Sequence, residues 1–172
     1  MRGGKQSPPA VNLSEILWSW LGAFLGITPV AFLHYNMFSE RDIVLIIGSF
    51  GASAVLIYGA IRSPLAQPRN LVGGHLVSAV VGVASYKLFP DALWLASSFG
   101  VATAIAAMHA TKTLHPPGGA TALIAVIGGE QIHKLGFYYA LMPVGSGVLI
   151  MLLVAVIINN IAKNRRYPEF WL

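Results

Sequence analysis

The sequence predicts an all-α integral membrane protein, a bundle of about six transmembrane segments with a parallel internal repeat of helix-break-helix units. Hydrophobic residues make up 56% of its 172 residues and charged residues only 10%, whereas soluble domains usually carry about a quarter charged residues. The mean hydropathy is +0.69. The apolar residues also lie in long blocks, unlike the one-sided pattern of a soluble helix, so we expect lipid to surround them.

The hydrophobic blocks define the elements in chain order. They are Leu13–Leu33, Ile43–Ile61, Leu71–Phe89, Leu93–Ala110, Gly118–Ile132 and Leu135–Ile161. A full helical crossing needs about 20 residues, so the fifth block either crosses or re-enters. Residues 13–162 are the predicted transmembrane domain, and residues 1–12 and 163–172 are predicted cytoplasmic tails.

The basic residues predict the orientation. Alternating crossings place most of the 11 Lys and Arg residues on one side, namely Arg2, Lys5, Arg62, Arg69, Lys112, Lys163, Arg165 and Arg166. Arg41, Lys87 and Lys134 fall on the other side. Short cytoplasmic loops are rich in Lys and Arg. We therefore expect a multi-pass protein of the inner (plasma) membrane with cytoplasmic termini, and we assign the net charge of +5 to topology, with no nucleic-acid partner.

Small residues recur at helical spacing within the blocks. Such stripes let helix backbones approach closely in lipid. We interpret them as packing surfaces, within the chain or between copies in a homo-oligomer, and give them no catalytic role. They are Gly22 and Gly26, Ser49 and Ser53, and Ala96, Gly100 and Ala104.

Two stretches form the internal repeat. "SFGASAVLIYGAIRSPLAQPRNLVGGH" begins at Ser49 and "SFGVATAIAAMHATKTLHPPGGAT" begins at Ser98. Each starts with Ser-Phe-Gly, passes through small residues, reaches a proline-containing break with basic residues, and resumes at Gly-Gly. The copies lie two segments apart, so both breaks are predicted to face the same side, related by an axis along the membrane normal.

The two breaks have the composition of an anion site. If helices restart at the Gly-Gly pairs, their first N–H groups lack helical partners and lie at the positive end of the helix dipole. Basic side chains attract an anion, and Asn, Thr and His groups replace part of its hydration shell. The predicted substrate-binding residues are Arg69, Asn70, Gly73, Gly74, His75, Lys112, His115, Pro116, Pro117, Gly118, Gly119 and Thr121.

Other interpretations of these residues stay open. Pro-Pro-Gly-Gly is a common turn sequence, and Arg62, Arg69 and Lys112 also serve as topology signals. The acids of the predicted segments, Glu15 and Glu130, lie near segment ends. Cation transporters and carboxylate proton relays normally use a buried acid, which favours an anion. We interpret the remaining histidines, His34, His109 and His133, as helix-end or packing residues.

Metal binding and catalysis find no support in the sequence. The chain has no cysteine, no His-Glu-x-x-His motif and no Gly-x-Ser-x-Gly elbow. No nucleophile lies at a readable spacing from a base. We therefore predict no metal, no cofactor and no enzymatic activity.

Two motifs resemble those of a known family. "SPLAQPRNLVGGH", from Ser63, and "LHPPGGATAL", from Leu114, are similar to the signatures of the HPP family of integral membrane proteins, named for a tripeptide seen here as His115-Pro116-Pro117. The similarity runs from about the first block to the last. Plant plastid and cyanobacterial members are implicated in nitrite transport, so the resemblance implies a small anion such as nitrite as substrate.

These observations lead to two hypotheses. The first is a carrier or channel for a small inorganic anion, with nitrite the leading candidate, whose site is formed by the two Gly-Gly helix starts. The alternative is a membrane-embedded scaffold or sensor without transport activity, in which the breaks are turns and the small-residue stripes are an oligomer interface. The two hypotheses differ in one observable, the flux of an anion.

Overall fold

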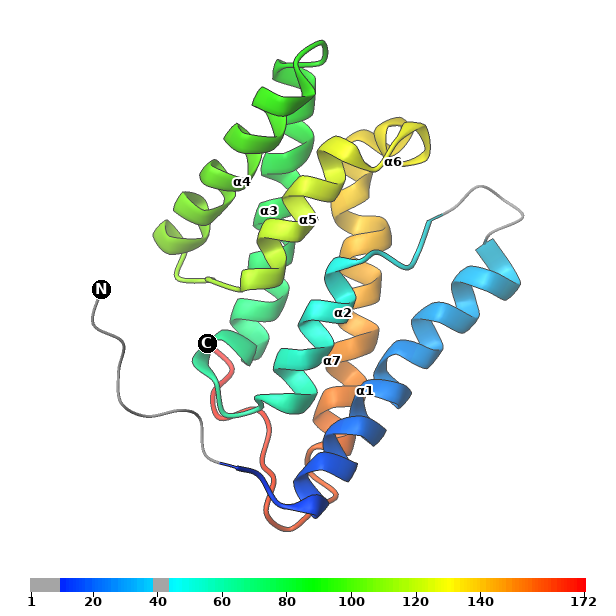
Figure 1. Ribbon diagram of the computed structural model, residues 1–172, viewed down its shortest axis with the longest axis vertical. Coiled ribbons are helices and arrows are strands. Elements are labelled where there is room, and N and C mark those ends of the chain that lie inside the picture. Colours follow the sequence, from blue (N-terminus) through cyan, green and yellow to red (C-terminus); the bar gives the residue numbers. More distant parts are fainter. Residues whose placement is uncertain (1–9, 39–43) are drawn as a thin grey trace.

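The computed structural model describes residues 10–38 and 44–172, which form helices joined by turns and short connections, with no strand among them (Figure 1). Helix α1 (Leu13–Leu33) continues into a π-helical turn at His34–Phe38. Helix α2 (Ser49–Ala54) continues into a second π-helical turn at Val55–Gly59, and a 3-10 turn follows at Pro64–Ala66. The longer helices α3 (Pro68–Leu88) and α4 (Leu93–Ala110) come next.

The last part of the chain is more broken. Helix α5 (Pro116–Ile127) is followed by the short α6 (Glu130–Leu135). A 3-10 turn at Gly136–Ala140 and a π-helical turn at Leu141–Gly145 then lead into α7 (Ser146–Ile158). Met142 has non-helical φ and ψ angles of −140° and 120°. The predicted sixth segment is therefore interrupted just before Pro143, because a proline disfavours helix in the preceding residue.

Four helical stretches in the described part of the chain are long and apolar enough to cross a membrane. They are Leu13–Met37, Pro68–Leu88, Leu93–Ala110 and Glu130–Ile158. The second predicted segment was too long, since its apolar helix covers only Ser49–Gly59 and residues 44–48 are not helical. The helix of the fifth segment covers only Pro116–Ile127. Both are about half as long as a full crossing requires, and six complete crossings stay a prediction.

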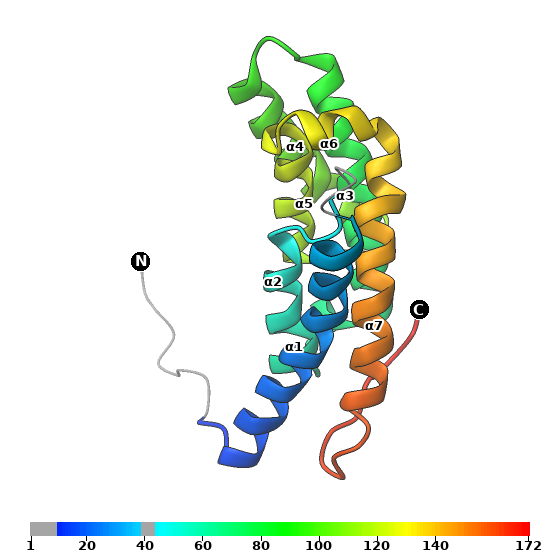
Figure 2. The ribbon, with the colours of Figure 1, turned by 90° about the vertical axis from the view of Figure 1, so that its right-hand side faces the viewer.

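Helix α3 is the centre of the bundle. It packs against α4 and α5 on one side and against α7 on another, while α1 packs against α7 and the turn after α2 (Figures 1 and 2). The half-length helices α2 and α5 contact each other and run in opposite directions from the middle of the bundle (Figure 1). Large apolar side chains such as Leu17, Phe24 and Leu153 are exposed on the outside, as expected of a lipid-facing surface.

The small-residue stripes mark close contacts between helices. On α1, Gly22 and Gly26 are buried against the ring of Tyr58, so closely that a Cβ atom at Gly26 would overlap the phenol oxygen. The Tyr58 hydroxyl in turn donates a hydrogen bond to the carbonyl oxygen of Met151 in α7 at 2.9 Å. The glycine stripe thus admits a tyrosine that links three elements, because glycine has no side chain to keep it out.

The basic residues of the described chain lie in or next to its connections. Arg62 and Lys163 lie close to the start of α1 and the end of α7, and we call this end of the bundle the basic end. Arg69 and Lys112 lie at the connections that lead into α3 and α5, whereas Lys87 lies at the far end of α3 and Lys134 in α6. The orientation in the membrane stays a prediction. Arg2, Lys5 and Arg41 fall outside the described residues.

The segment after α7 folds back onto the bundle. The Tyr167 hydroxyl donates to the carbonyl oxygen of Ala66 at 2.7 Å, and the backbone N–H of Glu169 donates to the side-chain oxygen of Gln67 at 2.8 Å. Residues 163–172, predicted as a tail, therefore cover the connection that leads into α3.

Candidate functional site

Both predicted breaks exist, and each ends in a helix that begins with proline. Gln67 and His115 have extended backbones, with ψ angles of 156° and 107°, and Pro68 and Pro116 occupy the first positions of α3 and α5. The residue before a proline prefers this conformation, and proline is favoured at the first helical position. The sequence therefore determines both helix starts locally.

The first Gly-Gly pair was placed wrongly. Helix α3 begins at Pro68, so Gly73 and Gly74 lie in its second turn and not at its start. The N–H of Leu71 already donates to the carbonyl oxygen of Gln67 at 2.8 Å. Helical hydrogen bonding is thus established before the glycines, and the predicted unpaired N–H groups are absent there.

The second break also offers few backbone donors. Pro116 and Pro117 have no N–H group, and the N–H of Gly118 donates to the carbonyl oxygen of His115 at 2.8 Å. The start of α5 therefore lacks the row of free N–H groups on which helix N-terminal anion sites depend.

The buried glycines serve another purpose, the close approach of α3 and α5. A Cβ atom on Gly118 would lie 2.7 Å from Ser78 Oγ and 2.9 Å from the carbonyl oxygen of Gly74. A Cβ atom on Gly74 would lie 2.6 Å from the Cβ atom of His115. These glycines bring the two breaks together because no side chain separates the backbones.

A buried chain of side-chain hydrogen bonds lies at this contact. Ser53 Oγ in α2 lies 2.7 Å from His75 Nε2 in α3 and 3.0 Å from His115 Nε2 at the start of α5. The Nδ1 atom of His75 lies 2.7 Å from Thr121 Oγ1, which is hydrogen-bonded to Ser49 Oγ at 2.9 Å. We call the set Ser49, Ser53, His75, His115 and Thr121 the histidine chain.

The histidine chain is fully buried. Each of its five side chains has an exposed fraction of 0%. The ring centroids of His75 and His115 are 5.0 Å apart. The Nδ1 atom of His115 lies 2.7 Å from the carbonyl oxygen of Leu65, which anchors this ring to the first break. All four imidazole nitrogens thus have partners, as buried polar groups require.

One buried hydroxyl beside the histidine chain is different. Ser78 lies in α3 less than one turn after His75, has an exposed fraction of 0%, and its Oγ atom has no hydrogen-bond partner. An unpaired buried hydroxyl costs about 1–3 kcal/mol. Ser78 is therefore a free polar group at the contact of α3 with α5.

The remaining predicted site residues surround this centre. The Asn70 amide donates to the carbonyl oxygen of Leu114 at 2.8 Å, and the Arg69 guanidinium donates to the carbonyl oxygen of Thr111 at 3.1 Å. Both residues therefore hold the second break against the first. Lys112 and Pro116 are exposed, and Gly73 packs against Thr113.

Lys112 has a structural role in ending α4. Its φ angle is +57°, and its N–H donates to the carbonyl oxygen of His109 at 3.1 Å. The N–H of Thr113 donates to the carbonyl oxygen of Met108 at 2.8 Å. These paired bonds form a Schellman motif, in which the left-handed residue is usually glycine.

Substituting Lys112 by glycine is therefore expected to stabilise the protein by about 1 kcal/mol, because a left-handed conformation costs a lysine roughly that amount. Thermal unfolding in detergent measures the effect. Lys112→Ala, which removes the charge but keeps the strain, is the matched control. A Lys112→Gly variant no more stable than Lys112→Ala would contradict this role.

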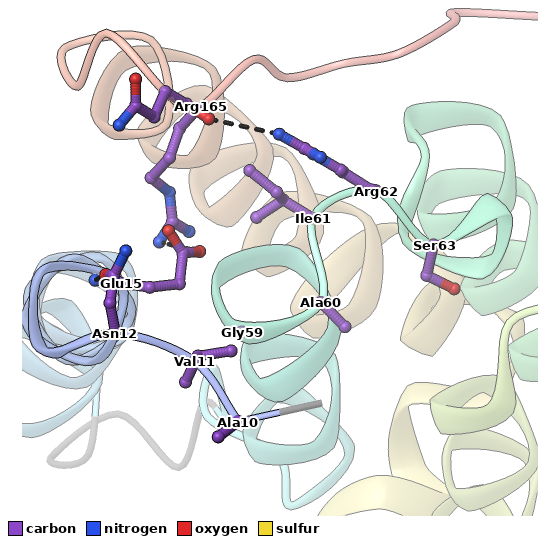
Figure 3. A pocket seen from close by; sticks show the side chains of 11 residues that line it. Ala10, Val11, Asn12, Glu15, Gly59, Ala60, Ile61, Arg62, Ser63 and Arg165 are labelled. Atoms are coloured by element: carbon purple, nitrogen blue, oxygen red, sulfur yellow. Dashed lines mark hydrogen bonds and ion pairs between the residues drawn. The ribbon is translucent and has the colours of Figure 1, made fainter. Parts of the chain in front are cut away.

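A separate, open cavity of about 760 Å³ lies at the basic end of the bundle (Figure 3). Its lining includes Asn12, Glu15, Arg62, Ser63, Asn164 and Arg165. Arg165 is bound on several sides: it forms an ion pair with Glu15 at 2.8 Å, donates to Asn159 Oδ1 at 2.9 Å and donates to the Tyr58 carbonyl oxygen. Burial lowers the pKa of the Arg165 guanidinium, and the charge of Glu15 acts in the opposite direction.

Because the buried Arg165 guanidinium donates to Glu15 in α1, to the Tyr58 carbonyl oxygen and to Asn159 at the end of α7, Arg165→Met is expected to destabilise the protein by about 1–3 kcal/mol, the cost of leaving buried acceptors unpaired. Arg166→Met is the matched control, since the neighbouring Arg166 is exposed. Thermal unfolding of both variants in detergent checks the difference. Equal midpoints would show that the Arg165 contacts contribute nothing.

The sequence did not identify Ser49 and Ser53 as polar partners of the histidines. Both were interpreted as packing residues. Ser53 in fact lies between His75 and His115, which are 22 and 62 residues away from it along the chain. His34 and His133 have structural roles: His34 Nδ1 accepts from the N–H of Leu45 at 3.3 Å, and the His133 ring stacks on that of Tyr86. No three side chains of metal-binding type lie together among the described residues.

Comparison with known proteins agrees with the motifs at the two breaks. The family model for the HPP transmembrane region matches residues 8–168. Two curated transmembrane proteins of Dictyostelium discoideum are similar to the chain. One is 53% identical over 173 residues, which cover 99% of this chain and 55% of that protein. The other is 47% identical over 172 residues, which cover 98% of this chain and 60% of that protein.

The chain therefore spans less than two thirds of the length of these relatives. No solved structure matches it. The family match extends over both proline breaks and all the described helices, and it shows that the chain belongs to the HPP family of integral membrane proteins.

Proposed function

We propose that this protein transports a small inorganic anion across a membrane, with nitrite as the first candidate. The observation that carries the proposal is the histidine chain, a fully buried set of polar side chains where two half-length helices meet inside an apolar bundle. Polar groups at such a place are costly and usually line a substrate or ion path. Helices interrupted near the midplane are also typical of transporter binding sites.

The chemistry of the site favours an anion. Serine and threonine hydroxyls and imidazole N–H groups are hydrogen-bond donors, and Ser78 adds a hydroxyl that has no partner. In the described part of the chain the carboxylates, such as Glu15, Asp91, Glu130 and Glu169, lie at helix ends or in connections. A nitrite ion has two acceptor oxygens and is small enough to bridge Ser78 and the histidine chain after a modest separation of α3 from α5.

This binding mode differs from the one predicted from the sequence. The donors are side chains of α2, α3 and α5, because Gly73 and Gly74 lie inside α3 and the start of α5, with two prolines and a bonded Gly118 N–H, offers few free backbone donors. The glycines contribute by letting α3 and α5 approach. Arg69 and Lys112 lie next to the two breaks, where their charges attract anions from solution.

The anion reaches the histidine chain through movement of the half-length helices α2 and α5. An open, mainly apolar cavity of about 530 Å³ lies beside the start of α3 and reaches Thr113, just before the second break; it is lined by Pro68, Arg69, Val72, Gly73, Thr113, Leu152, Trp171 and Leu172. Because the histidine chain is buried, the anion enters only when α2 or α5 moves relative to α3. We propose that the basic end faces the cytoplasm of an inner (plasma) membrane, following the positive-inside rule, and that the two proline breaks are related as a parallel repeat.

Uptake by proteoliposomes tests the proposal. Purified protein is reconstituted and the initial uptake of nitrite, nitrate, formate and chloride is compared with that of empty vesicles at pH 8, where nitrous acid is scarce. We expect uptake of nitrite above empty vesicles. No flux of any of these anions would contradict transport and leave the scaffold or sensor hypothesis.

A further inference from the structure

We infer that the histidine chain carries one proton together with each anion, so that the protein is a proton–anion symporter. The inference rests on the proposed transport function and goes beyond it by naming the coupling ion. It follows from the hydrogen-bond pattern of five buried side chains contributed by three helices and the residue that caps α5.

The carbonyl oxygen of Leu65 determines the first hydrogen position. A carbonyl only accepts, so His115 Nδ1 carries a hydrogen and donates it at 2.7 Å. When His115 is neutral, its Nε2 atom accepts from the Ser53 hydroxyl. The oxygen of Ser53 then accepts from His75 Nε2, and His75 Nδ1 accepts from the Thr121 hydroxyl. Thr121 then has no hydrogen left for Ser49, so in this arrangement the bond between them needs the Ser49 hydroxyl as donor.

The same heavy-atom positions also accept one added proton. With the charge on His115, both of its nitrogens donate, one to Leu65 and one to Ser53. Ser53 then donates to His75 Nε2, His75 Nδ1 donates to Thr121, and Thr121 donates to Ser49 at 2.9 Å. Each of these hydrogen bonds is the reverse of that in the uncharged chain, and this second arrangement keeps Thr121 as the donor to Ser49.

The proton moves between the histidines by a balanced exchange. When α2 or α5 moves relative to α3, a proton from the medium binds His75 Nδ1 while the Thr121 hydroxyl turns toward Ser49. The N–H bond at His75 Nε2 then breaks as its hydrogen bonds to Ser53 Oγ, and the original hydrogen of Ser53 forms a new N–H bond at His115 Nε2. Ser53 ends with one hydrogen, and one positive charge has passed from His75 to His115. The proton leaves to water where the anion is released.

Burial explains why the proton and the anion move together. An unpaired charge inside the bundle is costly. The neutral histidine chain bears no charge, and an imidazolium beside an anion is a compensated pair. Each ion therefore raises the affinity for the other, and this coupling is reciprocal.

Other groups that face the histidine chain do not take this role. From the turn Gly136–Ala140, the Tyr139 hydroxyl donates to the Thr121 carbonyl oxygen at 3.2 Å. From α2, the Phe50 ring packs against that of His75 in an edge-to-face arrangement, with centroids 5.9 Å apart. On α3, Arg69 donates to the Thr111 carbonyl oxygen, outside the histidine chain. Among these neighbours, the two imidazoles are the groups whose ring nitrogens can both accept and donate a proton.

An uptake assay in nitrite-loaded proteoliposomes separates two possible driving forces, the pH gradient and the membrane potential. We expect initial nitrite uptake by the wild-type protein to rise severalfold when the outside is acidified by one pH unit, and to be unaffected by an inside-positive potassium diffusion potential. Uptake that follows the potential and ignores the pH gradient would overturn proton coupling while leaving transport intact. No flux above empty vesicles would instead contradict the proposed function itself.

Ser53 variants test the path of the proton. Ser53→Ala removes the bridging hydroxyl, so we expect pH-driven uptake to fall at least tenfold and nitrite–nitrite exchange to fall clearly less than uptake. Ser53→Thr keeps the hydroxyl and is expected to restore pH-driven uptake. Ser98→Ala, at an exposed serine of α4, is the matched control. An equal loss of uptake and exchange in Ser53→Ala, without rescue by Ser53→Thr, would show that Ser53 is only structural and overturn the path.

Discussion

Replacing Gly118 with alanine is expected to lower the free energy of unfolding by about 1–3 kcal/mol, the usual cost of overpacking. The added Cβ atom would lie 2.9 Å from the carbonyl oxygen of Gly74 and 2.9 Å from Met108 Sδ, besides its contact with Ser78. Backbone at this distance cannot give way without moving α3 from α5. Thermal unfolding in detergent measures the loss, and Gly118→Leu is expected to be worse and to prevent stable folding.

The next residue is the matched control. A Cβ atom on Gly119 would have Val101 Cγ1 as its nearest neighbour at 4.0 Å. Alanine is favoured over glycine in a helix by up to about 1 kcal/mol, so Gly119→Ala is expected to be neutral or stabilising. The two variants thus change stability in opposite directions. If both lower stability equally, the close contact of α3 and α5 is not what Gly118 provides.

Removing one imidazole of the histidine chain is expected to have the largest effect on flux. His115→Ala should reduce nitrite–nitrite exchange by at least tenfold, because a hydrogen bond to a charged group contributes about 1.5–3 kcal/mol. His109→Ala is the control, since His109 is exposed in the last turn of α4. Unfolding midpoints of both variants are measured alongside exchange. A well-folded His115→Ala protein that exchanges nitrite at the wild-type rate would contradict a role for His115 in anion binding.

Much of this site was predictable from local sequence. The proline pairs with Gln67 and His115 determine where α3 and α5 begin, since a residue before proline is extended and proline suits the first helical position. The similarity of the two breaks indicated that they lie on the same side, and the Asn70 and Arg69 hydrogen bonds do join the first break to the second. His75 and His115, singled out because each flanks a glycine pair, form the centre of the buried network.

The rest depends on contacts between distant parts of the chain. Ser53 follows Ser49 by one helical turn, a spacing that also suits packing, and only the fold brings it between His75 and His115. The Gly73-Gly74 pair was taken for a helix start because glycine commonly marks a break, whereas here it lets α3 pack against Thr113 and His115. The short length of α2 was also hidden, because the apolar residues 44–48 before it are not helical.

The central claim is that a small anion binds at the histidine chain. Nitrogen-15 NMR of the five histidines in lipid nanodiscs, assigned with single His→Gln variants, tests it directly. Adding nitrite is expected to shift the imidazole resonances of His75 and His115 and to leave that of the exposed His109 unchanged. Unchanged His75 and His115 resonances at nitrite concentrations that saturate uptake would place the anion elsewhere and contradict the account.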